Sequence, residues 1–174
     1  GAEQGITTGW SDGSFRPLNV CNRAAVVTFL WRLAGCPAPA AIADFADMPE
    51  DTEANSDFRN AISWAAEQGI TTGWEEADGT ATFRPWNKCN RAAIVTFLWR
   101  YAGRPEASAV GDFADMPADT AANSDFRSAI SWAAEQGITT GWDESDGSMT
   151  FRPWNICNRL AVMSFLSRYA ALEA

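Results

Sequence analysis

The sequence contains no histidine and a single lysine, Lys88, among its 174 residues. The absence of histidine excludes Ser-His and Cys-His nucleophilic catalysis, imidazole acid–base chemistry and most zinc sites. Because arginine supplies every other side-chain cation, cationic recognition here depends on guanidinium groups, which favour planar bidentate contacts with carboxylate or phosphate. No apolar run approaches the roughly 20 residues that a bilayer-spanning helix requires. We therefore expect no membrane span.

Positive charge is scarce overall, with 13 Lys and Arg residues against 22 Asp and Glu residues and a net charge of −9. This acidity argues against a nucleic-acid binder, which needs a basic surface to contact phosphates. The hydrophobic fraction of 47% is typical of a globular protein and argues against wholesale disorder. The acidic residues gather in turns and linkers, as solvated surface does, rather than as a catalytic pair. We expect no enzyme.

The dominant feature of the sequence is an internal repeat. Residues 55–74 read NSDFRNAISWAAEQGITTGW and return as residues 123–142, with Asn60 replaced by Ser128. A Phe-Arg-Pro step recurs every 68 residues, at residues 15–17, 83–85 and 151–153. The sequence therefore predicts one partial repeat, residues 1–37, and two full repeats, residues 38–105 and 106–174.

Each full repeat is predicted to form two helices joined by a loop. The first helix has Ser56-Asp57, or Ser124-Asp125, as N-cap candidates and a stop at Gly69. The second has Asn90 as N-cap and runs to Gly103. Apolar residues cover far more than one stripe of this second helix, which predicts a central position packed against its equivalents from the other repeats.

The first residues, 1–10, match the end of a first helix and the loop that follows it. We therefore expect the first repeat to lack nearly all of its first helix, which leaves apolar surface uncovered. A helix from a partner chain, self-association or an upstream segment would cover that surface. Fraying with tolerated exposure is the alternative.

Five short patterns carry a family resemblance: Phe-x-Asp-Met-Pro, Ala-Ile-x-Trp-Ala, Gly-Ile-Thr-Thr-Gly, Asp-Gly-x-Phe-Arg-Pro and Arg-Ala-x-x-x-x-Phe-Leu-x-Arg. In order and spacing they resemble the S-layer homology (SLH) repeat over essentially the whole chain. The resemblance implies an all-α, pseudo-threefold helical repeat assembly with a central three-helix bundle and loop-plus-helix prongs. It also implies an extracellular bacterial location, in the cell wall or S-layer. There such repeats anchor surface proteins non-covalently to secondary cell-wall polysaccharides, often pyruvylated ones.

The family's best-known binding motif resembles Ile-Thr-Arg-Ala-Glu at the start of the central helix. The matching stretches keep the arginine in all three repeats, replace the threonine by asparagine and replace the glutamate by alanine. The retained residues are Arg23, Arg91 and Arg159, preceded by Asn22, Asn90 and Asn158. The loss of the glutamate changes the glycan contact network that the resemblance implies, and the arginine charge is kept.

Three residue sets are the candidate ligand-binding residues: the motif arginines, the asparagines that precede them (Asn22, Asn90 and Asn158) and the loop tryptophans. The three motif arginines lie at predicted helix N-termini, where free N–H groups and a guanidinium together suit a carboxylate or phosphate; the alternative is that each pairs with a nearby acid and joins adjacent repeats. The loop tryptophans, which either stack on a sugar ring or pack, are Trp10, Trp74 and Trp142. The other repeated arginines, in the Phe-Arg-Pro step, are interpreted as structural.

The remaining repeated residues predict structure rather than chemistry. Cys21, Cys89 and Cys157 are interpreted as small buried hydrophobic residues, and the acidic turns as plain Asp-Gly turns. We expect no metal and no cofactor. The leading hypothesis is a non-catalytic wall-anchoring module that binds an anionic cell-wall polysaccharide in grooves between repeats. The alternative is an assembly module that accepts a partner helix at the first repeat.

Overall fold

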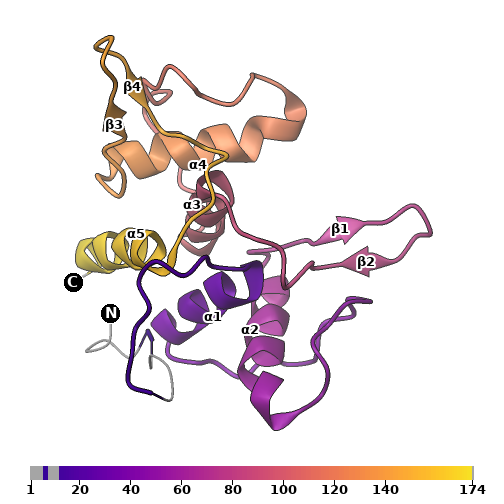
Figure 1. Cartoon of the computed structure of the whole chain (residues 1–174). Coiled ribbons are helices and arrows are strands. Elements are labelled where there is room, and N and C mark those ends of the chain that lie inside the picture. The colour runs from indigo at the N-terminus through magenta and orange to yellow at the C-terminus, as the bar shows by residue number, and fades with distance from the viewer. Residues whose placement is uncertain (1–5, 8–11, 174) are drawn as a thin grey trace. The chain divides into compact units, whose positions relative to one another are not determined.

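The computed structural model describes residues 6–7 and 12–173 of the chain, which divides into two compact units, Gly1–Cys89 and Asn90–Ala174. The first unit contains helices α1 (Arg23–Leu33) and α2 (Ser56–Glu67) and strands β1 (Trp74–Glu75) and β2 (Ala81–Thr82) (Figure 1). The second contains helices α3 (Arg91–Tyr101), α4 (Ser124–Glu135) and α5 (Arg159–Leu172) and strands β3 (Trp142–Asp143) and β4 (Met149–Thr150). Because α1 packs on α2 and α3 on α4, each unit joins the second helix of one repeat to the first helix of the next.

The predicted N-caps of the second helices are confirmed. The side-chain oxygens of Asn22, Asn90 and Asn158 each accept a hydrogen bond from the backbone N–H three residues later, at 2.8–2.9 Å. The N-caps predicted for the first helices are wrong. Ser56 is already the first residue of α2, and its hydroxyl donates backwards to the carbonyl of Glu53, in a short 3₁₀ turn over Glu53–Asn55.

The helices differ in burial as their sequences predict. Eight of the eleven residues of α1 are buried, and the same holds for α3, so these helices are covered nearly all round. In α2 the buried residues are confined to Ala61–Ala65, which leaves the outer face to solvent. The pseudo-threefold arrangement and the central bundle relate elements of both units, and they stay predictions.

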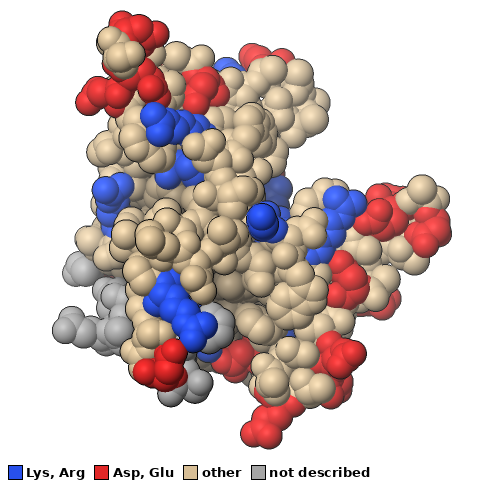
Figure 2. All heavy atoms as spheres, in the orientation of Figure 1, with Lys and Arg blue, Asp and Glu red and all other residues tan. Residues whose placement is uncertain are grey.

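The expectation of an all-α fold is wrong, because two antiparallel hairpins make the architecture mixed α/β. Strand β1 pairs with β2 and strand β3 with β4. The predicted Asp-Gly turns close both hairpins: Gly79 has a φ of 82°, and the Asp78 carboxylate accepts hydrogen bonds from the N–H and hydroxyl of Thr80. Acidic side chains gather on the β1–β2 hairpin (Figure 2), whose strand and turn contain Glu75, Glu76 and Asp78.

One glycine before each hairpin allows a close approach that no other residue permits. Gly141 has a φ of 70°, and a Cβ built on it would lie 2.5 Å from the ring of Phe113 and 2.7 Å from the carbonyl oxygen of Thr150. Gly73 has the same surroundings in the first unit. Gly147, at the turn of the second hairpin, also has a positive φ, but a Cβ there would meet nothing within 4 Å.

Candidate functional site

Arg91, the first residue of α3, is the most informative of the predicted site residues. Its side chain is only 8% exposed, and its Nε donates a 2.8 Å hydrogen bond to the carbonyl of Phe151. The guanidinium carbon lies 4.0 Å from the ring centroid of Trp142, a cation–π distance. The ring of Phe165 on α5 lies 4.9 Å away. The motif arginine is therefore fixed in place by aromatic rings and one backbone carbonyl.

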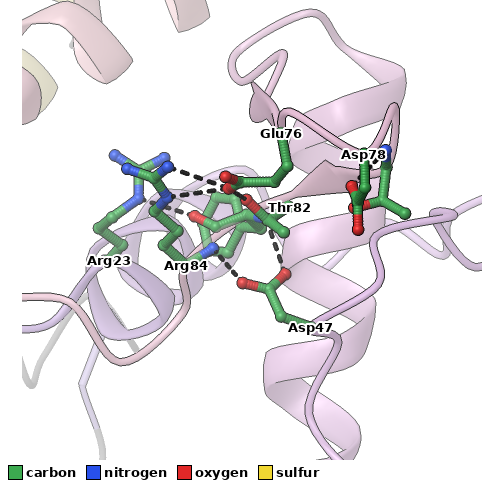
Figure 3. Close-up of polar contacts among 8 residues, drawn as sticks. Arg23, Asp47, Glu76, Asp78, Thr82 and Arg84 are labelled. Atoms are coloured by element: carbon green, nitrogen blue, oxygen red, sulfur yellow. Dashed lines mark hydrogen bonds and ion pairs between the residues drawn. The ribbon is translucent and has the colours of Figure 1, made fainter.

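The first unit builds the same arrangement around Arg23 (Figure 3). Arg23 donates from Nε to the carbonyl of Phe83 at 3.0 Å, and its guanidinium carbon lies 4.1 Å from the Trp74 ring centroid. Asp47 holds this loop, since its carboxylate accepts the N–H groups of Phe83 and Arg84 at 2.8 and 2.7 Å. Figure 3 shows the Arg84 side chain reaching Glu76, with which it forms a 2.9 Å ion pair.

The arginine of the Phe-Arg-Pro step has the same structural part in the second unit. Arg152 forms a 2.9 Å ion pair with Glu144, and Asp115 accepts hydrogen bonds from the N–H groups of Phe151 and Arg152, both at 2.7 Å. The hydroxyl of Thr150 and the guanidinium of Arg152 hold the pKa of Glu144 below its usual value. These contacts support the interpretation that this arginine is structural.

The expectation that the helix N-terminus offers free N–H groups to an anion is wrong for α1 and α3. In α3 the N–H groups of Arg91 and Ala92 donate to the carbonyls of Asn155 and Pro153, at 3.0 and 2.9 Å. The next N–H donates to the Asn90 cap. The loop after the hairpin thus occupies the donors that sequence reasoning assigned to a ligand, and the arginine side chain alone remains to bind an anion.

Electrostatics distinguish Arg91 from the structural arginines. Among the residues that the structure describes, no aspartate or glutamate forms an ion pair with it. Burial lowers the pKa of Arg91 to about 10; the positive charges of Arg152 and Arg168 act in the same direction, and the negative charge of Asp115 opposes them. The side chain is still protonated at neutral pH. The alternative that Arg91 merely pairs with a nearby acid is therefore not what the structure shows.

Arg91 lines a cavity of about 250 Å³ within the second unit. Besides Arg91, the wall combines Trp142 and Phe165 with polar or charged side chains and small residues: Thr139, Thr140, Gly141, Ala161, Ser164 and Arg168. Two cations, three hydroxyl groups and two aromatic rings line this cavity, and none of its lining residues is acidic. Its volume lies slightly below the range of roughly 300–1,000 Å³ that is usual for small-molecule sites.

A second cavity of about 490 Å³ lies between α4 and residues 105–110. It is larger, but it carries both signs of charge, because Glu106 and Asp119 line it together with Arg127. Arg127 is already engaged, since it donates to the carbonyl of Pro117 at 2.6 Å and lies 3.6 Å from the Asp119 carboxylate. Of these two cavities, the smaller one is lined by positive charge alone.

The chain matches no known family profile and no curated protein sequence. Within the described part of the chain, no helix combines the length and the apolar character that crossing a bilayer requires. Nor do three or more histidine, cysteine or acidic side chains come together there in a way that could hold a metal ion.

The other predicted site residues fall into three groups. Trp10 lies outside the described residues, and Arg159 is half-buried at the first position of α5. Trp74 and Trp142 are each 37% exposed, and each ring contacts two guanidinium groups. The sequence predicted that these rings either stack on a sugar or pack; in the structure they contact arginine side chains. The asparagines are helix caps, as described above.

The three repeated cysteines are buried, as predicted, whereas Cys36 is exposed. Burial raises the pKa of the Cys157 thiol to about 11, which makes it a poor nucleophile at neutral pH.

Sequence reasoning missed Arg168, Thr139, Thr140 and Ser164 as cavity residues. Thr139 accepts a weak 3.5 Å contact from the guanidinium of Arg91. A signal for Arg168 was available, because it repeats Arg32 and Arg100 at the 68-residue spacing.

Proposed function

We propose that the chain is a non-catalytic cell-wall-anchoring module that binds an anionic, pyruvylated secondary cell-wall polysaccharide, as its resemblance to SLH repeats implies. The observation that carries the proposal is the cavity around Arg91. It holds a buried guanidinium without an acidic partner among the described residues, beside tryptophan and hydroxyl groups. Buried charges in proteins are normally paired, so an unpaired one that lines a cavity favours an anionic ligand.

The binding mechanism follows from the same contacts. The Nε of Arg91 already donates to the carbonyl of Phe151. A ketal carboxylate would therefore accept hydrogen bonds from the two terminal guanidinium nitrogens of Arg91. Trp142 and Phe165 would keep the guanidinium in one orientation, so little side-chain entropy is lost on binding. The hydroxyls of Thr139, Thr140 and Ser164 would meet the hydroxyl groups of the sugar.

The proposal is tested by sedimentation of the full chain with purified bacterial cell walls that carry pyruvylated polysaccharide. We expect retention on native walls and loss of retention on walls from which acid has removed the polysaccharide. Arg91→Gln should weaken binding by about ten-fold or more, since a hydrogen bond to a charged group contributes on the order of 1.5–3 kcal/mol. A triple variant that combines Arg91→Gln with Arg23→Gln and Arg159→Gln removes the motif arginine from all three repeats. Arg127→Gln, which changes an ion-paired arginine of the second unit, is the matched control. Equal retention on native and stripped walls would contradict the proposal.

A further inference from the structure

The repeat places an arginine at equivalent positions near the ends of α1, α3 and α5. Arg32 forms a 2.7 Å ion pair with Asp57, and Arg100 forms a 2.6 Å ion pair with Asp125. Each acid lies in the first turn of the helix that packs alongside, so the charge is compensated within the scaffold.

Arg168 differs from its two equivalents. It forms no ion pair with any acidic residue that the structure describes, and one guanidinium nitrogen donates instead to the carbonyl of Ile138 at 2.9 Å. Its side chain is exposed and lines the same cavity as Arg91. The remaining guanidinium donors of Arg168 are available to a ligand in that cavity.

The cavity therefore holds two like charges without a lining acid. Burial is the main cause of the lowered pKa of Arg91, and the positive charge of Arg168 adds a smaller effect in the same direction. A ligand with one carboxylate compensates only one of the two guanidinium groups. A ligand with a second acidic group within the span of a sugar residue compensates both, and gains a further charge-assisted contact.

We propose that this cavity selects a doubly anionic segment of the polysaccharide, in which Arg91 binds the ketal carboxylate and Arg168 binds a second acidic group, a carboxylate or phosphate on the same or the adjoining sugar. Arg168 is thus a specificity-determining residue. The inference rests on the proposed function, because it assumes that an anionic sugar occupies the cavity.

Isothermal titration of the full chain with three probes tests the inference. The first is a methyl hexoside with one pyruvate ketal, the second is the same sugar joined to a glucuronic acid, and the third is the same sugar bearing a phosphate. We expect the chain to bind at least one of the doubly charged probes about ten-fold more tightly than the first at low salt, with the preference decreasing as salt is added. Which probe is preferred distinguishes a carboxylate from a phosphate.

The variants separate this inference from the proposed function. Arg168→Gln should abolish the preference for a doubly charged probe, whereas Arg168→Lys should keep part of the preference because the charge remains. Arg100→Gln, at the equivalent, ion-paired position, should leave the preference intact. If the chain binds all three probes equally, or if Arg168→Gln keeps the preference, the inference is wrong while anionic anchoring stands. If the chain binds none of them, both are wrong.

Discussion

Asp115 holds the loop that presents the Phe151 carbonyl to Arg91, so replacing it should destabilise the second unit. Both carboxylate oxygens are used, each accepting a backbone N–H at 2.7 Å, from Phe151 and Arg152. Phe151 is fully buried, so water cannot replace the lost acceptor at that end of the loop. Asp115→Asn has the same shape but puts an NH₂ group where one carboxylate oxygen was.

The magnitude follows from these two hydrogen bonds. Asparagine keeps one acceptor, so one charge-assisted hydrogen bond, of about 1.5–3 kcal/mol, is lost. The backbone N–H that has lost its acceptor then faces the NH₂ group of the asparagine and is left unsatisfied, which costs on the order of a further 1 kcal/mol. We expect the free energy of unfolding of the second unit to fall by about 3 kcal/mol, and Asp47→Asn to have a similar effect on the first unit.

Equilibrium unfolding in urea, followed by circular dichroism, measures this loss. Asp119→Asn is the matched control, because its side chain is 89% exposed and lies 3.6 Å from Arg127. An exposed ion pair contributes little, so the control should stay within about 0.5 kcal/mol of the parent chain. If Asp115→Asn is no more destabilising than Asp119→Asn, the loop is not held in the way the structure indicates.

Three further predictions concern the same unit and the cysteines. Gly141→Ala should lower the free energy of unfolding in urea by about 2 kcal/mol or more, because the added Cβ would clash with Phe113 and the Thr150 carbonyl. Gly147→Ala should cost only about 1 kcal/mol, from left-handed backbone strain. Equal losses would contradict the close approach at Gly141. The pKa of Glu144 is lowered in the folded chain, so its stabilisation is complete above its unfolded pKa and is lost as the pH falls through the folded pKa. Glu144→Gln should therefore make the free energy of unfolding depend less steeply on pH below that unfolded pKa, and an unchanged slope would refute this. Iodoacetamide at about pH 8 should alkylate the exposed Cys36 alone in the native chain, as mass spectrometry would show, and early labelling of Cys157 would be inconsistent with its burial and raised pKa.

Much of the helical scaffold could be predicted from the sequence, because its signals are local. A cap such as Asn90 and a stop such as Gly69, with its φ of 65°, depend on residues within one or two turns. The hairpins were missed because each strand is only two residues long, which is too short for an alternating pattern to show. The Asp-Gly turn was recognised, but its pairing strands were not.

The candidate site was predicted only in part, because its geometry joins residues that are distant along the chain. The motif singled out Arg91 and the loop singled out Trp142, but their contact across 51 positions of sequence is a property of the fold. The N–H groups at the start of α3 were expected to be free, and only the structure shows the carbonyls of Pro153 and Asn155 that occupy them. Arg168 has the same local sequence role as Arg100, and only its surroundings reveal that it is not paired with an acid.

In the proposed function, the Arg91 guanidinium is the group that binds an anionic sugar. The most direct measurement is nuclear magnetic resonance of the arginine Nε–H and tryptophan indole signals during titration with a pyruvylated methyl hexoside. We expect saturable shifts at Arg91 and Trp142, no comparable shift at Arg127, and loss of the Trp142 shift in Arg91→Gln. If the ligand leaves the Arg91 and Trp142 signals unchanged while the chain still binds cell walls, the binding site lies elsewhere and Arg91 is not the anion-binding group.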